Sequence, residues 1–301
     1  MFDLYVRGEW WFAAAQLSLA MFGMGATLRA DDFIAVFRQP RAFAVGFVVQ
    51  IVVIPLIALA LDAALDPPPG IAFGIILVAA APGGAMSNVF TYFAKSNVPL
   101  SIALTAVVTL TCMATTPLVL RLLAGDLVPP EFVMPVGAIA FDIAVCLLIP
   151  LALGMAAGAP LPTATRALIA RWCIRGSLAV VVLIAVGSAG AGRLDVGAHG
   201  GGAILLVLLF AFLAQQAGTL AGVLLGLPRA DIGAISIEAA IRNTNLALLL
   251  KASLFPAVAG VADPMADGVL FTALLFGGLS APLIIPLILV HRRLARREAT
   301  A

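Results

Sequence analysis

The chain alternates between long runs of apolar residues and short polar connections. Nine of these runs have the length of a membrane-spanning helix, which needs about 20 residues to cross roughly 30 Å of hydrocarbon. They cover residues 10–28, 42–62, 70–92, 98–121, 133–157, 168–190, 203–225, 231–252 and 266–290. Such runs are too long for barrel strands, and a helix satisfies its own backbone hydrogen bonds in lipid. The pattern predicts an all-α polytopic membrane protein with about nine transmembrane helices.

Composition supports this class. Of 301 residues, 63% are hydrophobic and 11% are charged, whereas soluble domains carry about 25% charged residues. The short connections leave no room for a separate soluble domain, so residues 1–301 are predicted to form a single unit. The net charge of +2 predicts no nucleic-acid partner.

Basic residues are distributed unequally between the two sides of the predicted bundle. Because positive residues are retained in the cytoplasm, their majority predicts a cytoplasmic C-terminus and an outer N-terminus. The majority is Arg29, Arg38, Arg41, Lys95, Arg166, Arg171, Arg175, Arg229, Arg292, Arg293, Arg296 and Arg297, and the minority is Arg7, Arg121, Arg193 and Lys251.

Helix-breaking and polar residues interrupt the third run. Pro82 removes a backbone donor and Gly83-Gly84 is a weak helix former, so the helix is predicted to break there. Broken backbone at membrane depth is tolerated where it is buried in protein or lines a cavity. Ser87 and Asn88 follow at a new helix N-terminus. On this segment alone, a simple proline kink whose freed backbone groups are satisfied by these two side chains is an equal alternative.

The fourth run adds two hydroxyls. Ser101 and Thr105 are four residues apart and share one helix face, although such hydroxyls often bond the carbonyl one turn back. A short polar turn folds this run back beside the broken one. Together with Ser87 and Asn88, these residues would offer four neutral oxygens to a hard cation that still lacks an anionic ligand.

The eighth run supplies an acid. Glu238 and Arg242 lie about midway along an apolar segment, where charges are costly and usually functional. They are four residues apart and could form a structural ion pair on one face. That alternative leaves the triplet Asn243-Thr244-Asn245 unexplained, and the triplet favours a second unwound stretch. Two broken helices in corresponding places of two halves are typical of secondary transporters with inverted repeats.

At these residues the sequence resembles the bile acid:sodium symporter family. The resemblance covers nearly the whole chain, from MFGMGATLRADDF through PGGAMSNVFTYFAKSNVPLSIALT to SIEAAIRNTNLALLL. It implies an inverted-repeat core domain, approximately 42–121 and 203–290, in which two broken helices cross, and a panel domain, approximately 10–28 and 133–190. It also implies a multi-pass protein of the plasma (bacterial inner) membrane, in contact with membrane lipid, and no protein partner is predicted.

The resemblance further implies two sodium sites beside the crossing, with sodium as the coupling ion. The first would use Ser87, Asn88, Ser101, Thr105 and Glu238, the set already gathered from polarity and spacing. The second would use Gln50, Glu238 again and backbone oxygens near Ala239 and Ile241.

Arg242 departs from the family pattern E-x-G-x-Q-N, because the chain reads Glu238-Ala239-Ala240-Ile241-Arg242-Asn243. A guanidinium has five donors and no acceptor, so it cannot ligate sodium. We predict that Arg242 is a tethered substitute for the second sodium, which leaves at most one coupled sodium, or that it contacts an anionic substrate directly.

The resemblance implies an organic-anion substrate. Asn243 matches a family position that faces the cavity, and Ala85 and Met86 lie at the other broken helix, where substrate would approach. An arginine beside two helix N-termini favours a negative group. Some bacterial relatives carry a His-Asn pair where this chain has Leu275-Phe276, which predicts a more apolar wall there. The predicted function is secondary active import of a small organic anion, coupled to sodium by alternating access.

Proton-coupled or uncoupled organic-anion transport by the same fold is the alternative. Asp142, a lone acid in the fifth run, would relay protons, hold a structural role or contact water between the domains. An intramembrane enzyme is disfavoured, since His199 and His291 lie in a loop and at a span end and form no metalloprotease motif. No catalytic residue is predicted. A channel is disfavoured because the polar residues gather in one cluster, and a non-transporting receptor of the same fold stays open.

Overall fold

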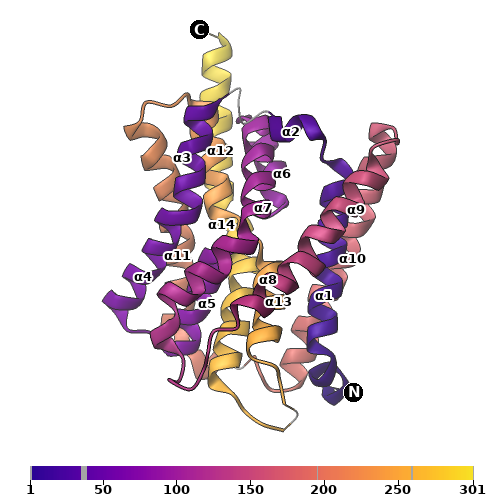
Figure 1. Ribbon diagram of the computed structural model, residues 1–301. Helices are drawn as coiled ribbons and strands as arrows, with labels where there is room; N and C mark the ends of the chain where they lie inside the picture. Colours follow the sequence, from indigo (N-terminus) through magenta and orange to yellow (C-terminus); the bar gives the residue numbers. More distant parts are fainter. Residues whose placement is uncertain (1, 35–38, 195, 259, 301) are drawn as a thin grey trace.

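The computed structural model describes residues 2–34, 39–194, 196–258 and 260–300, which fold into a bundle of helices (Figure 1). Within these ranges the secondary structure is helical apart from one isolated antiparallel bridge, between Gly83 and Arg242. The first helix begins and the last helix ends at opposite ends of the bundle (Figure 1).

The helices follow one another with short connections. They are α1 (Phe2–Thr27), α2 (Ala30–Ile34), α3 (Pro40–Val48), η2 (Val49–Val53), α4 (Ile54–Leu65), α5 (Pro69–Ala80), α6 (Met86–Phe93), α7 (Val98–Leu123), η3 (Gly125–Leu127), α8 (Val136–Ile143), η4 (Ala144–Leu148), α9 (Ile149–Gly158), α10 (Thr163–Gly190), α11 (Val196–Leu224), α12 (Arg229–Ala240), α13 (Thr244–Leu254) and α14 (Pro264–Thr300).

Six continuous helical segments are long and apolar enough to cross a membrane. They are Pro40–Leu65, Val98–Leu123, Val136–Gly158, Thr163–Gly190, His199–Leu224 and Pro264–Arg296. The chain is therefore a multi-pass helical membrane protein. The third and eighth predicted runs are each divided into two short helices, α5 with α6 and α12 with α13. The total of nine spans stays a prediction.

Two of the long segments contain a π-helical turn that ends two residues before a proline. The turn η2 precedes Pro55, and η4 precedes Pro150. Proline lacks the amide hydrogen and its ring clashes with the carbonyl one turn back, and a widened turn relieves that clash. Gln50 lies inside η2 and is buried, and π turns of this kind are frequent at functional sites.

The helices form two groups that meet near the middle of the bundle. In the first, α1 packs along α10 and α9, on the right of Figure 1. The second contains α5, α7, α11, α12, α13 and α14. Helix α8 packs against α7 and α13, while α9, its continuation, packs against α1. The predicted panel segment 133–157 thus touches both groups, and the division into core and panel domains stays a prediction.

The structure adds one fact to the distribution of basic residues. Lys251, counted among those of the N-terminal side, is fully buried within α13. Arg38 and the side chain of Arg297 lie outside the described part of the chain. The orientation of the termini relative to the membrane stays a prediction.

Candidate functional site at the crossing of two broken helices

The two unwound segments meet and pair. The Gly84 amide donates to the Ile241 carbonyl at 2.8 Å, and the Asn243 amide donates to the Pro82 carbonyl at 2.8 Å. Each broken helix thus satisfies backbone groups freed by the other, as buried irregular backbone requires. The predicted break at Pro82 is confirmed.

The second break lies slightly earlier than the Asn-Thr-Asn triplet indicated. Helix α12 ends at Ala240, and Thr244 and Asn245 already belong to α13. Asn243 caps α13, because its side-chain oxygen accepts from the Leu246 amide at 3.2 Å. The polar triplet is therefore used to restart a helix, and only its first member lies in the unwound stretch.

Gly83 is required at the crossing because of a close approach. A Cβ built at this position would lie 2.2 Å from Oε2 of Glu238 and 3.3 Å from Oε1 of Gln50. Only a residue without a side chain lets the first unwound segment pass this close to the carboxylate.

Glu238 is the centre of an oxygen cluster formed by the five residues predicted for the first site. Its Oε1 accepts from Ser87 Oγ and Ser101 Oγ, each at 2.5 Å, and from Thr105 Oγ1 at 2.8 Å. Asn88 completes the cluster, with its Oδ1 2.8 Å from Ser101 Oγ. The tertiary structure thus brings together side chains from α6, α7 and α12.

Sequence reasoning missed one neighbour of the oxygen cluster. Thr91 is fully buried, and its hydroxyl donates to Ser101 Oγ at 3.2 Å. Thr91 follows Ser87 by four residues on α6 and therefore shares its helix face. The four-residue spacing that linked Ser101 with Thr105 in the sequence also links Ser87 with Thr91, and it could have indicated this residue.

The oxygen cluster suits a hard cation in chemistry. Glu238 is fully buried, and its Oε2 has no hydrogen-bond partner. Around a cation of calcium's size, oxygens lie at about 2.3 to 2.6 Å, so neighbouring ligands are roughly 3.4 Å apart. Ser87 Oγ and Thr105 Oγ1 are 3.4 Å apart, while the hydroxyls bonded to Glu238 lie closer to it. Binding therefore needs the hydroxyls to turn their protons away and separate from the carboxylate by several tenths of an ångström.

Arg242 occupies the region predicted for the second site. Its Nη1 donates to Gln50 Oε1 at 3.1 Å, and its Nη2 donates to the Ala79 carbonyl at 2.8 Å and to the Ala81 carbonyl. The Gln50 carbonyl lies 3.4 Å from the same nitrogen. Ala79 and Ala81 lie at the C-terminal end of α5, where helix carbonyls lack partners and the dipole is negative.

No ion pair joins the described side chains of Glu238 and Arg242, so the structural salt bridge considered from the sequence does not form. The four-residue spacing implied a shared face only if the helix continued, but α12 ends at Ala240. The Ile241 carbonyl, a predicted ligand of the second site, already accepts from Gly84. Ala239 is buried in the last turn of α12.

A cavity of about 270 Å³ lies beside the crossing. The four predicted substrate residues line it, and α1, α10 and α14 form its other walls. The lining includes Ala85, Met86, Arg242, Asn243, Met21, Ile174, Ser177, Gly277 and Ser280.

Leu275, Phe276 and Asp142, which were singled out in the sequence, do not line this cavity. Gly277 and Ser280 form the α14 wall, whereas Phe276 is buried with its ring 5.8 Å from that of Phe210. The expectation that Leu275-Phe276 makes the wall apolar is therefore wrong, because neither residue is among those that line the cavity. Asp142 is buried, is not part of the lining, and has no hydrogen bond at Oδ2.

The fold and this geometry define a multi-pass helical membrane protein with two interrupted helices that cross beside buried polar groups. The model of the Sodium Bile acid symporter family matches residues 14–191. The chain belongs to this family, and the resemblance noted in its sequence is confirmed. The matched range includes α5, α6 and α7 but ends before Glu238 and Arg242.

Three relatives illustrate the similarity. An uncharacterized sodium-dependent transporter of Bacillus subtilis, YocS, is 41% identical over 46% of this chain and 42% of its own length. The probable chloroplastic sodium/metabolite cotransporter BASS2 of Oryza sativa is 32% identical over 78% of this chain and 55% of its own. The human ileal sodium/bile acid cotransporter is 28% identical over 57% of this chain and 49% of its own. The chain thus spans about half the length of these curated relatives.

Proposed function

We propose that this protein is a secondary transporter that imports a small organic anion by alternating access, coupled to one sodium ion. The oxygen cluster would bind that sodium, and Arg242 would replace a second one. The names of all three relatives contain sodium-dependent transport or cotransport, which supports the ion. The observation that carries the proposal is the contrast between a buried carboxylate ringed by hydroxyls and a buried guanidinium ringed by carbonyls.

A cation at the oxygen cluster is favoured by the charge of Glu238. A buried carboxylate is costly unless a cation or several hydrogen bonds compensate it. Among the described residues, no group of three His, Cys, Asp or Glu side chains gathers, so hydroxyl and amide oxygens would complete the ligand set. Such a set, with a single anion, suits a monovalent hard cation.

Thr105 has the second acceptor that such binding requires. Its hydroxyl lies 3.0 Å from the Ser101 carbonyl as well as 2.8 Å from Glu238. When its proton points to the carbonyl, its lone pairs face the carboxylate side of the cluster. The residue can therefore change from a donor to Glu238 into a cation ligand by rotating one hydrogen.

Arg242 supplies a permanent positive charge where the family resemblance implied a second sodium. Oxygen atoms surround its guanidinium, as they would surround a metal ion, but the charge cannot dissociate. These bonds also direct it towards α5, so the geometry favours the role of sodium substitute over direct contact with substrate.

The cavity favours a small anion. Its volume of about 270 Å³ lies slightly below the range of about 300 to 1,000 Å³ typical of drug-sized ligands. Met86 and Thr244, the first residues of α6 and α13, both line it. Two helix N-termini therefore face the same space, and their partial positive charges stabilise a carboxylate or similar group.

Sodium titration of the purified protein tests the ion sites without knowledge of the substrate. The melting temperature is followed as sodium chloride replaces potassium chloride at constant ionic strength, since a ligand of the folded state raises it. We expect a sodium-specific rise with a single-site dependence. Arg242→Gln should make the dependence steeper, because a second sodium can then bind.

Arg166→Gln is the matched control. Arg166 is also buried and donates to two carbonyls, those of Ala26 and Leu28, but it belongs to α10. This variant should lose stability and keep the single-site sodium dependence. If Arg242→Gln shows the same sodium dependence as the native protein, the substitution hypothesis is wrong.

Uptake into proteoliposomes tests the coupling. Organic anions that raise the melting temperature in sodium but not in potassium are used as radiolabelled probes. Uptake should require an inward sodium gradient. Uptake that persists without sodium and follows a pH gradient would contradict sodium coupling and favour the proton-coupled alternative.

A further inference from the structure

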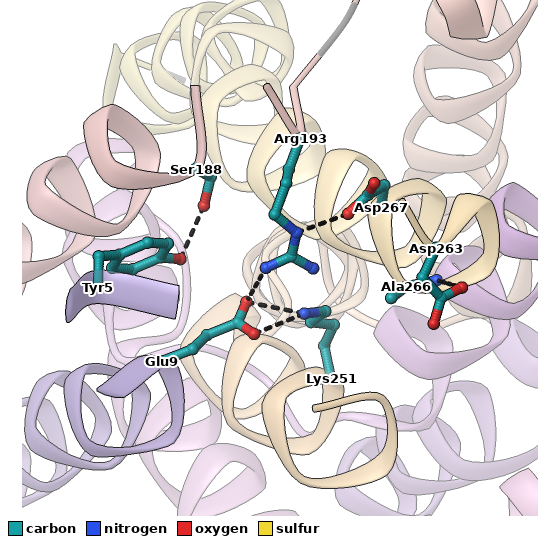
Figure 2. A network of polar contacts seen from close by, with 8 residues as sticks. All are labelled: Tyr5, Glu9, Ser188, Arg193, Lys251, Asp263, Ala266 and Asp267. Carbon is teal, nitrogen blue, oxygen red and sulfur yellow. Dashed lines mark hydrogen bonds and ion pairs between the residues drawn. The ribbon is translucent and has the colours of Figure 1, made fainter. Parts of the chain in front are cut away.

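Four charged side chains, two buried and two partly buried, form a network of ion pairs (Figure 2). Lys251 Nζ donates to both carboxylate oxygens of Glu9, at 2.7 and 2.8 Å. Arg193 donates from Nη1 to Glu9 at 3.0 Å and from Nε to Asp267 at 2.7 Å. We call Glu9, Arg193, Lys251 and Asp267 the ion-pair quartet. It holds two positive and two negative charges and is neutral as a whole.

The ion-pair quartet joins the two groups of helices. Glu9 lies on α1, and Arg193 follows the end of α10, which packs along α1. Lys251 and Asp267 come from α13 and α14, in the other group. The pairs Glu9–Lys251 and Arg193–Asp267 therefore cross between the groups, while Glu9–Arg193 lies within one of them.

The ion-pair quartet borders one pocket and lies about two helical turns from the candidate substrate cavity. A pocket of about 530 Å³ near the start of α1 is lined by Arg193 and Asp267, together with Val6 and Val258. Thr244 lines the candidate substrate cavity, and Lys251 follows it on α13 by about 10 Å along the helix axis. Neither Glu9 nor Lys251 lines either space.

Polar contacts between α1 and α13 lie on this side of the crossing. Besides the ion-pair quartet, Gln16 of α1 donates to the Asn245 carbonyl of α13 at 2.8 Å. Beyond the crossing, no hydrogen bond joins α10 to α6 within the described part of the chain, although residues of both line the cavity. On the N-terminal side of the crossing, by contrast, polar side chains link α1 to α13 and Arg193 to α14.

The energetics of the ion-pair quartet suit a contact that opens. Desolvation of buried charges nearly cancels their attraction, so a buried ion pair fixes geometry and adds little net stability. Burial alone would lower the pKa of the Arg193 guanidinium, but Glu9 and Asp267 outweigh it and raise that pKa above its ordinary value. If the groups part, Glu9 keeps Arg193 as a partner, and water solvates Lys251 and Asp267.

We propose that the ion-pair quartet is the gate that closes the candidate cavity towards the N-terminal face, and that its two cross-group pairs break when the cavity opens there. This inference rests on the proposed alternating access. By the distribution of basic residues, this face is the outer one.

Labelling of a cysteine placed in the cavity tests the gate, because the remaining native Cys112 and Cys146 are buried. The reporter is Ser177→Cys, on the α10 wall, in a background where the half-buried Cys173 is replaced by Ser. A membrane-impermeant maleimide is applied to the N-terminal face of membrane vesicles of defined orientation. Lys251→Met should raise the labelling rate by about fivefold or more, since removal of one partner from a buried pair destabilises the closed arrangement strongly.

Two further variants keep the test decisive. Asp267→Asn breaks the more accessible cross-group pair, whose carboxylate is 17% exposed, and should raise labelling even if Lys251→Met fails to fold. Tyr5→Phe is the matched control, because it removes a buried hydrogen bond to Ser188 at 2.7 Å between α1 and α10, on the same face but within one group. It should leave the rate unchanged.

The gate proposal is wrong if the labelling rate is unchanged in Asp267→Asn and in any Lys251→Met protein that folds. It is also wrong if Tyr5→Phe raises the labelling rate as much as these variants do. The readout needs neither sodium nor substrate. Failure of the gate is therefore distinguishable from failure of sodium coupling, which the titration of Arg242→Gln and the uptake assay test separately.

Discussion

The oxygen cluster around Glu238 and the contacts of Arg242 flank the same crossing but carry opposite charges. Glu238 accepts from three hydroxyls at one oxygen and forms no ion pair with a described side chain, whereas Arg242 donates to Gln50 and to two carbonyls at the end of α5. A fixed anion surrounded by hydroxyls can accept a cation from solution, because hydroxyls supply lone pairs when they rotate. A fixed cation surrounded by acceptors leaves no such place. The oxygen cluster is therefore a candidate site for an exchangeable cation, whereas Arg242 is a permanent cation of the chain.

The largest effect is expected from Glu238→Gln, which removes the only anion of the oxygen cluster. Loss of a buried charge partner costs about 3 kcal/mol, roughly 100-fold in sodium affinity. The sodium-dependent rise in melting temperature should vanish at concentrations that saturate the native protein. A rise that survives at native concentrations would place the sodium elsewhere.

Gly83→Ala should disturb both regions at once, because the added Cβ would lie 2.2 Å from Glu238 Oε2. Overpacking of this kind lowers the unfolding free energy by about 1 to 3 kcal/mol. Denaturation in detergent measures it. Gly137→Ala, where a Cβ meets nothing within 4 Å, is the control and should be near neutral. Equal stability of the two variants would contradict the close approach at the crossing.

Arg242→Lys keeps the fixed charge but reduces the contacts. A compact ammonium cannot reach Gln50 and both carbonyls together, and each buried acceptor left unpaired costs about 1 to 3 kcal/mol. We expect a lower melting temperature with an unchanged single-site sodium dependence, in contrast to Arg242→Gln. A steeper sodium dependence in Arg242→Lys would show that geometry, and not charge, excludes the second ion.

Thr105→Val removes one neutral ligand of the oxygen cluster. The loss of one hydroxyl should cost about 1 kcal/mol, or roughly fivefold in sodium affinity. Thr111→Val is the control on the same helix, since the Thr111 hydroxyl donates to the Val108 carbonyl at 3.1 Å, away from the oxygen cluster. If both variants titrate like the native protein, Thr105 is not a ligand.

The smallest effect is expected from Asp142→Asn. Asp142 does not line the cavity. We therefore expect the pH dependence of sodium-driven uptake of a radiolabelled probe to be the same in this variant and in the native protein. A loss of pH-driven uptake would instead support the proton relay.

The sequence by itself determined the membrane class, the first break and the composition of the oxygen cluster. These follow from local chemistry: apolar length sets a span, Pro82-Gly83-Gly84 cannot continue a helix, and hydroxyls four residues apart share a face. Arg242 stood out for the same reason, since a guanidinium cannot act as a metal ligand in any fold.

Only the tertiary structure decided what Arg242 contacts and which charges meet at the N-terminal side. The spacing of Glu238 and Arg242 suggested an ion pair, but the end of α12 at Ala240 turned Arg242 towards the carbonyls of α5. Glu9 and Lys251 are 242 positions apart, and their local sequences carry no signal that they meet. Contacts between distant segments depend on how helices pack, and a chain's local pattern does not contain that information.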